Sequence, residues 1–231
     1  STHRGTLFPY TTLFRSRSWC ISTDPEFDTK SADIIGLYLG APANVVVLSV
    51  DEKPCVQALE RQQGWLKMPD GRSMTGFAHE YKRHGTTNLF AALNVATGQV
   101  KARCFPRKRR EEFLQFLDSV TACHQGKEIH LILDNLSVHK LKSDHHWVKR
   151  HPHVYFHFTP THASWLNQIE VWFSILSRAA LKGASFRSVK QLVDAIENFL
   201  QAYNETASPF EWTKIRVSKK SPESKYANII N

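Results

Sequence analysis

The sequence predicts an α/β protein built on one mixed β-sheet with helices on its faces. Two apolar runs, Val45–Val50 and Ile129–Leu133, have the character of strands that are buried on both sides. Between and after them the apolar residues recur at helical spacing. The expected order is three strands, a helix, a strand, a helix, a strand and two helices. Antiparallel strands followed by alternating strands and helices indicate a mixed sheet.

The composition is that of a folded, basic protein. The 231 residues are 42% hydrophobic, enough for one core, and carry a formal charge of +9. This excess favours a polyanionic partner such as DNA, although it also serves solubility. The four cysteines are scattered without metal-site spacing, which fits a reducing cytoplasm. No apolar run reaches 18 residues, and we expect no membrane partner.

The front of the chain predicts a tail and a lead-in helix. The stretch Thr6–Ser16 reads TLFPYTTLFRS and matches the conceptual translation of a sequencing adapter. We therefore expect residues 1–16 to be a non-native tail and the preceding part of the gene to be lost. Residues 17–44 are expected to hold a helix and a linker, because Asp24 can cap a helix that Pro25 begins and Gly40 ends.

The region 45–206 is expected to form the main domain, with a basic tail at 207–231. Its expected strands are Val45–Val50, Thr86–Val95, Gln99–Phe105, Ile129–Leu133 and Val154–Phe158, and Gly64–Met68 is a candidate for a further short strand. Its expected helices are Glu111–Cys123, Ser137–Arg150, a helix capped by Ser164 that carries Glu170 in its middle and runs to about Leu181, and Ser188–Tyr203.

Three acids stand where a simple core would place apolar residues. Asp51 and Asp134 each follow a buried strand, and 35 residues separate Asp134 from Glu170, which lies in an apolar helix. Carboxylates are costly to bury together unless cations neutralise them. If the two strands are neighbours, the acids meet at one edge of the sheet, where hard oxygen ligands suit divalent metal. Alternatively, the two aspartates are turn residues and Glu170 is an exposed helix acid.

Four stretches together resemble the DDE-type transposases of the mariner-like superfamily, in the bacterial branch named for insertion sequence 630. They are LSVDEKP (Leu48–Pro54), HEYKRHGTTNLFAAL (His79–Leu93), LILDNLSVHK (Leu131–Lys140) and FTPTHASWLNQIEVWFSIL (Phe158–Leu176). The resemblance implies a ribonuclease-H-like fold, cut-and-paste transposition and catalytic, metal-binding roles for Asp51, Asp134 and Glu170. It departs at Gln168, where many relatives have proline, and in lacking N-terminal helix-turn-helix modules.

The resemblance also implies the chemistry. With two Mg²⁺ or Mn²⁺ ions held by the three acids, the protein would cut DNA strands at transposon ends and join them to a target. Glu52 is a weaker rival to Asp51, because alternation along a strand points it to the other side. Asn135 and His139 are expected to orient the carboxylate or the substrate. The expected DNA-binding residues are Lys82, Arg83, Arg107, Lys108, Arg109 and Arg110.

Several alternatives stay open. The basic run before the first catalytic-domain helix can be a solvated face, and Trp165 and Trp172 can be core residues rather than platforms for a base. The chain can be a nuclease of the same fold that cleaves without joining, or a silent DNA-binding remnant of a truncated element. A homodimer is also possible.

Overall fold

A computed structural model describes residues 22–70, 73–134 and 145–211 of the chain. Its helices and strands are α1 (Phe27–Gly40), β1 (Val45–Lys67), β2 (Ser73–Asn94), β3 (Val100–Phe105), α2 (Arg110–Thr121), β4 (Glu128–Leu133), α3 (His145–Arg150), β5 (Val154–Phe158), α4 (Ile169–Leu176) and α5 (Val189–Glu205). Short 3₁₀ turns occupy Ala122–His124 and Ser164–Leu166, and a π-helical turn, Ser177–Leu181, extends α4.

The described residues form a five-stranded mixed sheet in the order β3-β2-β1-β4-β5. The first three strands are antiparallel neighbours, whereas β4 runs parallel to both β1 and β5. The predicted mixed sheet is therefore confirmed. The parallel pairing needs a crossover, and α2 supplies it between β3 and β4.

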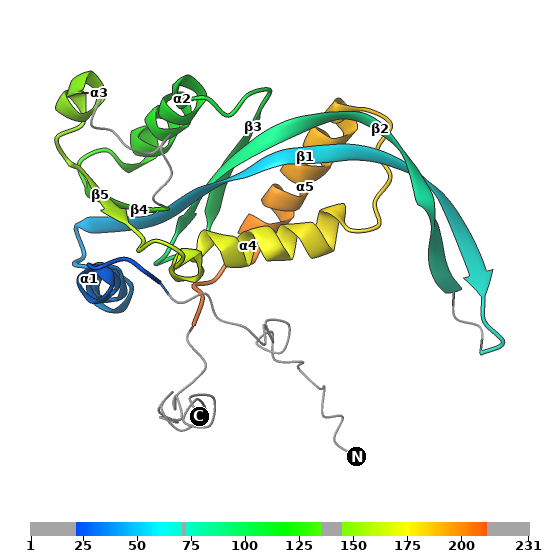
Figure 1. Cartoon of the computed structure of the whole chain (residues 1–231), viewed down its shortest axis with the longest axis horizontal. Coiled ribbons are helices and arrows are strands. Elements are labelled where there is room, and N and C mark those ends of the chain that lie inside the picture. The colour runs from blue at the N-terminus through cyan, green and yellow to red at the C-terminus, as the bar shows by residue number, and fades with distance from the viewer. Residues whose placement is uncertain (1–21, 71–72, 135–144, 212–231) are drawn as a thin grey trace, which may run out of the picture.

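Helices cover both faces of the sheet (Figure 1). On one face α2 and α3 pack through Phe113, Phe116 and Trp147 against the apolar side chains of β1, β2 and β4. On the other face α4 and α5 pack through Trp172, Leu176 and Leu192. A smaller cluster holds α1 against β1 and β4 through Ile34. The strands that carry the first two acids are therefore central and covered on both sides.

The first two strands are much longer than the sequence pattern predicted. The expected strand Val45–Val50 continues through Asp51 to Lys67, so the separate strand expected at Gly64–Met68 is the outer part of β1. With β2 it forms a hairpin that extends beyond the rest of the sheet (Figure 1). Pro54, which would normally end a strand, lies at a register shift between Lys53 and Val56, where no ladder N–H is needed.

One expected helix begins elsewhere, and another is described only in part. The helix that carries Glu170 starts at Ile169, because Ser164–Leu166 forms a separate 3₁₀ turn and Asn167 adopts an extended conformation. Glu170 is therefore in its first turn and not in its middle. Of the helix expected at Ser137–Arg150, the structure describes only α3, and its first part lies outside the described residues. Within the described part of the chain, no helix combines the length and apolar character that crossing a bilayer requires.

Candidate active site

The first two acids lie at the same level of neighbouring parallel strands. The ladder between β1 and β4 pairs Val45–Ser49 with Glu128–Ile132, and its last pair is Ser49 and Ile132. Continued for two more residues, this register sets Asp51 beside Asp134, which directly follows β4. Adjacent strands are about 4.8 Å apart, so the two backbones are close there. Alternation puts both side chains on the face of the sheet that α4 covers.

The Asp51 carboxylate is buried and held by two donors. Its residue is only 5% exposed. Oδ1 accepts the main-chain N–H of Glu52 at 2.7 Å, and Oδ2 accepts the side-chain amide of Asn167 at 3.4 Å. The same amide donates to the main-chain oxygen of Val50 at 3.1 Å. A residue more than a hundred positions away in the sequence thus orients the first acid.

A set of buried hydrogen bonds fixes the start of α4 on the sheet. Ser49 donates its hydroxyl to Oδ1 of Asn167 and accepts the N–H of Ile169 at 3.0 Å. Tyr38 of α1 donates its hydroxyl to the main-chain oxygen of Leu166 at 2.7 Å. Burial raises the pKa of Tyr38 to about 12, so its hydroxyl stays protonated as a donor. These contacts join α1, β1 and α4 directly beside Asp51.

The attachment of α4 to the sheet also positions Glu170, which is the residue after Ile169 in the first turn of this helix. Its side chain reaches solvent, yet the atoms crowded around the carboxyl raise its pKa by desolvation. The positive charge of Lys53 opposes this rise in pKa, and the negative charge of Asp134 adds to it. Lys53 and Asp134 are therefore both close enough to act electrostatically on the Glu170 carboxyl.

The carboxylates match a divalent metal in ligand chemistry but are not closed around one. Oxygen donors of this kind suit Mg²⁺ and Mn²⁺, and like charges that raise a neighbour's pKa are relieved by a cation. In the ranges that the structure describes, no three His, Cys, Asp or Glu side chains gather tightly enough to hold an ion.

Glu52, the rival of Asp51, faces the other way and has its own cation. Its Oε1 is 3.7 Å from Nζ of Lys108, and its side chain is buried. Arg109 is also engaged locally, at 3.0 Å from Glu111 and 2.6 Å from Glu112, and it caps α2. Two members of the basic run thus have structural partners, whereas Arg107 is exposed.

The remaining predicted residues are dispersed. Lys82 and Arg83 are exposed on the hairpin strand β2, away from the sheet edge that carries the acids. Asn135 and His139 lie outside the described residues. The two tryptophans differ: Trp172 is fully buried in the core, and Trp165 is 52% exposed.

Sequence reasoning missed Ser49, Lys53 and Asn167. A signal existed for the first, because Ser49 interrupts an otherwise apolar run and is completely buried. Asn167 lies three residues before Glu170, but its contact with Asp51 depends on tertiary structure. Lys53 follows Asp51 by two residues, which places both on one side of the strand.

Two solved structures share the fold. The chain resembles the Mos1 transposase in a paired-end complex with the left transposon end, with a TM-score of 0.55 and 11% identity over 79% of this chain and 54% of that one. For the Mos1 strand transfer complex the TM-score is 0.53 and the identity 10%, over 79% of this chain and 54% of that one. At such identities the likeness concerns the fold, which is ribonuclease-H-like, as predicted.

Sequence comparison adds a relative and a family. An insertion element IS630 uncharacterized 39 kDa protein of Shigella sonnei is 28% identical over 132 residues, which are 57% of this chain and 37% of that protein. The chain thus spans little more than a third of that relative's length. The family model described as DDE superfamily endonuclease matches residues 46–193, more than half of the chain and all three acids. The chain therefore belongs to the DDE superfamily of endonucleases.

Proposed function

We propose that this chain is the catalytic domain of a transposase that cuts DNA strands and joins them to a target, with Asp51, Asp134 and Glu170 as its metal ligands. The observation that supports this most is that the register of the parallel strands sets Asp51 beside Asp134, while Glu170 lies in the first turn of the helix that covers the same face. Asp51 and Asp134 end up on neighbouring strands, and Glu170 is near enough for its pKa to respond to Asp134.

The protein's own residues prepare the site. Asn167 and the Glu52 N–H hold the Asp51 carboxylate, and the Ser49 hydroxyl fixes the helix that carries Glu170. Lys53 supplies a positive charge beside the acids. When bound, Mg²⁺ or Mn²⁺ supplies activation of an attacking hydroxyl and stabilisation of the leaving 3′-oxygen. A divalent ion would relieve the repulsion between like-charged carboxylates at this edge of the sheet, which favours its binding there.

DNA is the partner that charge and family favour. The chain carries +9, and the two Mos1 structures that share its fold are complexes that contain a transposon end or represent strand transfer. We assign the exposed Arg107, Lys82 and Arg83 to phosphate contacts. A homodimer and a location with the bacterial nucleoid belong to the same proposal.

The test is a strand-cleavage assay with the 231-residue chain, Mg²⁺ and a DNA that is nicked or flanked at a transposon-type end. The parent is expected to cleave and, with target DNA present, to join. Asp134→Asn is expected to lose cleavage while keeping the parent's circular dichroism spectrum and melting temperature. Equal cleavage by this variant would contradict the site assignment.

The same assay separates joining from cutting. Products in which the 3′ end is covalently attached to target DNA support the transposase. Asp134-dependent cleavage that never gives joined products would make the chain a nuclease of the same fold. No cleavage by a folded parent with either metal would contradict the proposed activity for this chain.

A further inference from the structure

Lys53 lies on the same face of β1 as Asp51, two residues further along the strand. The β1–β2 ladder runs without a shift from Leu48 to Lys53, so side chains alternate regularly there and these two point to one side. Their Cα atoms are about 7 Å apart. Alternation puts Ser49 on this side as well, and its hydroxyl accepts the N–H of Ile169. Lys53 therefore points to the face of the sheet that α4 covers.

The side chain of Lys53 is seated on α4. Lys53 is half-buried, and its Nζ lies 5.8 Å from the centroid of the Phe173 ring. Phe173 is fixed in the core and is three residues after Glu170, so the two are neighbours on the helix surface. A ring attracts a cation without taking up its N–H groups in conventional hydrogen bonds. The ammonium is thus positioned beside the turn that carries Glu170 and still has donors to offer.

The charge of Lys53 acts on the carboxylates. Desolvation raises the pKa of Glu170, the positive charge of Lys53 lowers it, and the negative charge of Asp134 raises it. The effect on Glu170 shows that the ammonium is near the third acid, and the register of β1 puts its backbone near the first. Lys53 therefore belongs to the same site as the acids.

A cation is an unusual neighbour for residues that bind metal ions. An ammonium has three N–H donors and no lone pair, so it cannot ligate a metal ion and repels one. In a site that held metal ions alone, Lys53 would only weaken their binding. A cation at this place is favourable when an anion joins the metal ions, and the nonbridging oxygens of a phosphodiester accept charge-assisted hydrogen bonds.

A lysine can instead be the counter-ion of a carboxylate, and the other side of β1 shows that arrangement. There Nζ of Lys108 is 3.7 Å from Oε1 of Glu52, whose side chain is buried. The close contact of Lys53 is with the ring of Phe173. This difference favours a ligand that arrives with the substrate over a partner within the described part of the chain.

We propose that Lys53 binds the DNA backbone directly, by donating a hydrogen bond to a nonbridging oxygen of a phosphate that lies beside the three acids. The inference rests on the proposed function for the identity of the substrate. It deepens that function by naming a residue that holds the strand against the acids. Because a phosphate contact carries no sequence information, it serves the reaction at any sequence.

The first test measures binding without cleavage. It uses the 231-residue chain, a short blunt duplex, and Ca²⁺ in place of Mg²⁺. In NMR spectra, the side-chain ammonium signal of Lys53 is identified by its loss in Lys53→Arg. This signal should shift when the duplex is added and should stay in place when a duplex with an uncharged methylphosphonate backbone is added instead.

Fluorescence anisotropy at several salt concentrations gives the number of phosphate contacts. Lys53→Met keeps an unbranched side chain without its charge and should lower the salt slope by about 1, whereas Lys53→Arg should keep the slope of the parent. The matched control is Lys127→Met, because Lys127 is exposed and precedes β4 at the end opposite to Asp134. It should bind like the parent.

Two results would overturn the proposal. One is a Lys53 signal that does not move at saturating DNA, and the other is a salt slope for Lys53→Met equal to that of the parent. The first is measured on the parent itself, so it decides even if Lys53→Met does not fold. Melting temperatures establish that the variants used in the binding assay are folded.

The cleavage assay then locates the phosphate. Each duplex carries one methylphosphonate, and the bonds cut around it are mapped on denaturing gels, so that every cut defines its own register. In the parent, cutting should fall roughly tenfold or more where the neutral linkage is brought to Lys53. In Lys53→Met, which has already lost the contact, the same linkage should cost less than about twofold. Equal losses in both proteins at every position would assign the contact to another residue and overturn the proposal.

These results are separable from the fate of the proposed function. If the parent never cleaves but the Lys53 signal and the salt slope respond as expected, the proposed activity fails and the phosphate contact stands. If cleavage depends on Asp134 but neither the signal nor the slope responds, the phosphate contact alone fails.

Discussion

Asn167 holds Asp51 from the turn before α4, with its side-chain nitrogen 3.4 Å from Oδ2 of that carboxylate. Because Glu170 is three residues further on, one amide sets the position of the first acid and of the helix that carries the third. The distance between these acids is therefore controlled by a buried polar contact and not by sheet geometry alone.

Asn167→Ala should reduce both stability and cleavage. It leaves the Ser49 hydroxyl and the Val50 carbonyl without their buried partner, at a cost of about 1–3 kcal/mol in the free energy of unfolding. Cleavage should fall roughly 10- to 100-fold in addition, as when a ligand loses its orienting partner. Urea denaturation and single-turnover cleavage measure the two effects.

The matched control is Asn204→Ala. Asn204 also bridges a helix to a strand, through two hydrogen bonds of 2.8 Å to the main chain of Val100, but on β3. It should lower stability by a similar amount and leave cleavage per folded molecule unchanged. Equal cleavage losses in the two variants would mean that Asn167 acts on stability alone.

The basic run before α2 should divide into two roles. Arg107→Ala should weaken DNA binding and lower its salt slope by about 1, because the exposed side chain is available to phosphate. Arg109→Ala should instead lower stability slightly and change DNA affinity little, because Arg109 is paired with Glu112. Fluorescence anisotropy at several salt concentrations measures the effect on DNA binding, and urea denaturation measures the effect on stability. The reverse assignment of the two effects would contradict this division.

Trp172 in α4 and Trp165 in the turn before α4 should differ in how much they contribute to stability. Trp172→Ala should cost about 3–5 kcal/mol, because the ring is fully buried between the sheet and α5. Trp165→Ala should change the free energy of unfolding by less than about 0.5 kcal/mol, since its ring is half exposed. Similar losses in denaturant titrations of the two variants would be evidence against this packing.

Asp24 should make the free energy of unfolding depend on pH. It accepts a hydrogen bond from Nζ of Lys30 at 2.9 Å and from the N–H groups of Glu26 and Thr161 at 3.0 and 3.1 Å. The Lys30 contact first, and then the two N–H groups, hold the pKa of Asp24 below its ordinary value. A lowered pKa stabilises the folded state above the ordinary aspartate pKa of about 3.9, and this contribution is lost as the pH falls through the folded value.

The parent should therefore be more stable than Asp24→Asn at pH 7, and the difference should shrink in urea titrations as the pH falls below about 3.9. Asp28→Asn, in the first turn of α1, serves as a control. A difference that is constant down to the lowest pH at which the parent folds would mean that the Asp24 charge does not contribute.

The sequence predicted the sheet and marked Asp51 and Asp134 as candidate site residues because both depend on local pattern. The apolar runs around Val45–Val50 and Ile129–Leu133 marked the central parallel strands, and each of these two acids directly follows its run. Ser188 and the periodicity after it marked α5, whose first residue is Val189 and whose cap accepts from Gln191.

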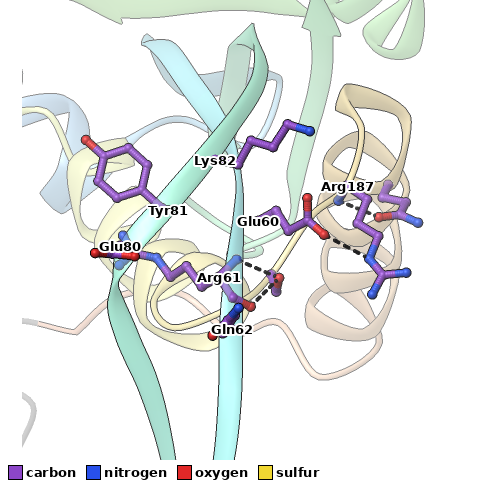
Figure 2. A pocket seen from close by; sticks show the side chains of 9 residues that line it. Glu60, Arg61, Gln62, Glu80, Tyr81, Lys82 and Arg187 are labelled. Carbon is purple, nitrogen blue, oxygen red and sulfur yellow. Dashed lines mark hydrogen bonds and ion pairs between the residues drawn. The ribbon is translucent and has the colours of Figure 1, made fainter.

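What the sequence could not predict depends on tertiary contacts. The hairpin continues past Pro54 only because a bulge removes the need for its N–H. The late start of α4 follows from the exchange of hydrogen bonds among Ser49, Asn167 and Ile169, which no local propensity contains. The pocket lined by residues 60–62 and 80–82 together with Ser185, Arg187 and Gln191 (Figure 2) joins residues more than a hundred positions apart, so no motif marks it.

The most direct test of the account is Mn²⁺ binding to the DNA-bound protein, followed by electron paramagnetic resonance as free Mn²⁺ is depleted. The parent should bind Mn²⁺, and Asp51→Asn, Asp134→Asn and Glu170→Gln should each lose at least one ion or weaken binding tenfold or more. Glu52→Gln, a neighbour of Asp51 paired with Lys108, should bind like the parent. If the three variants bind Mn²⁺ as the parent does, or if only Glu52→Gln loses it, these acids are not the metal site.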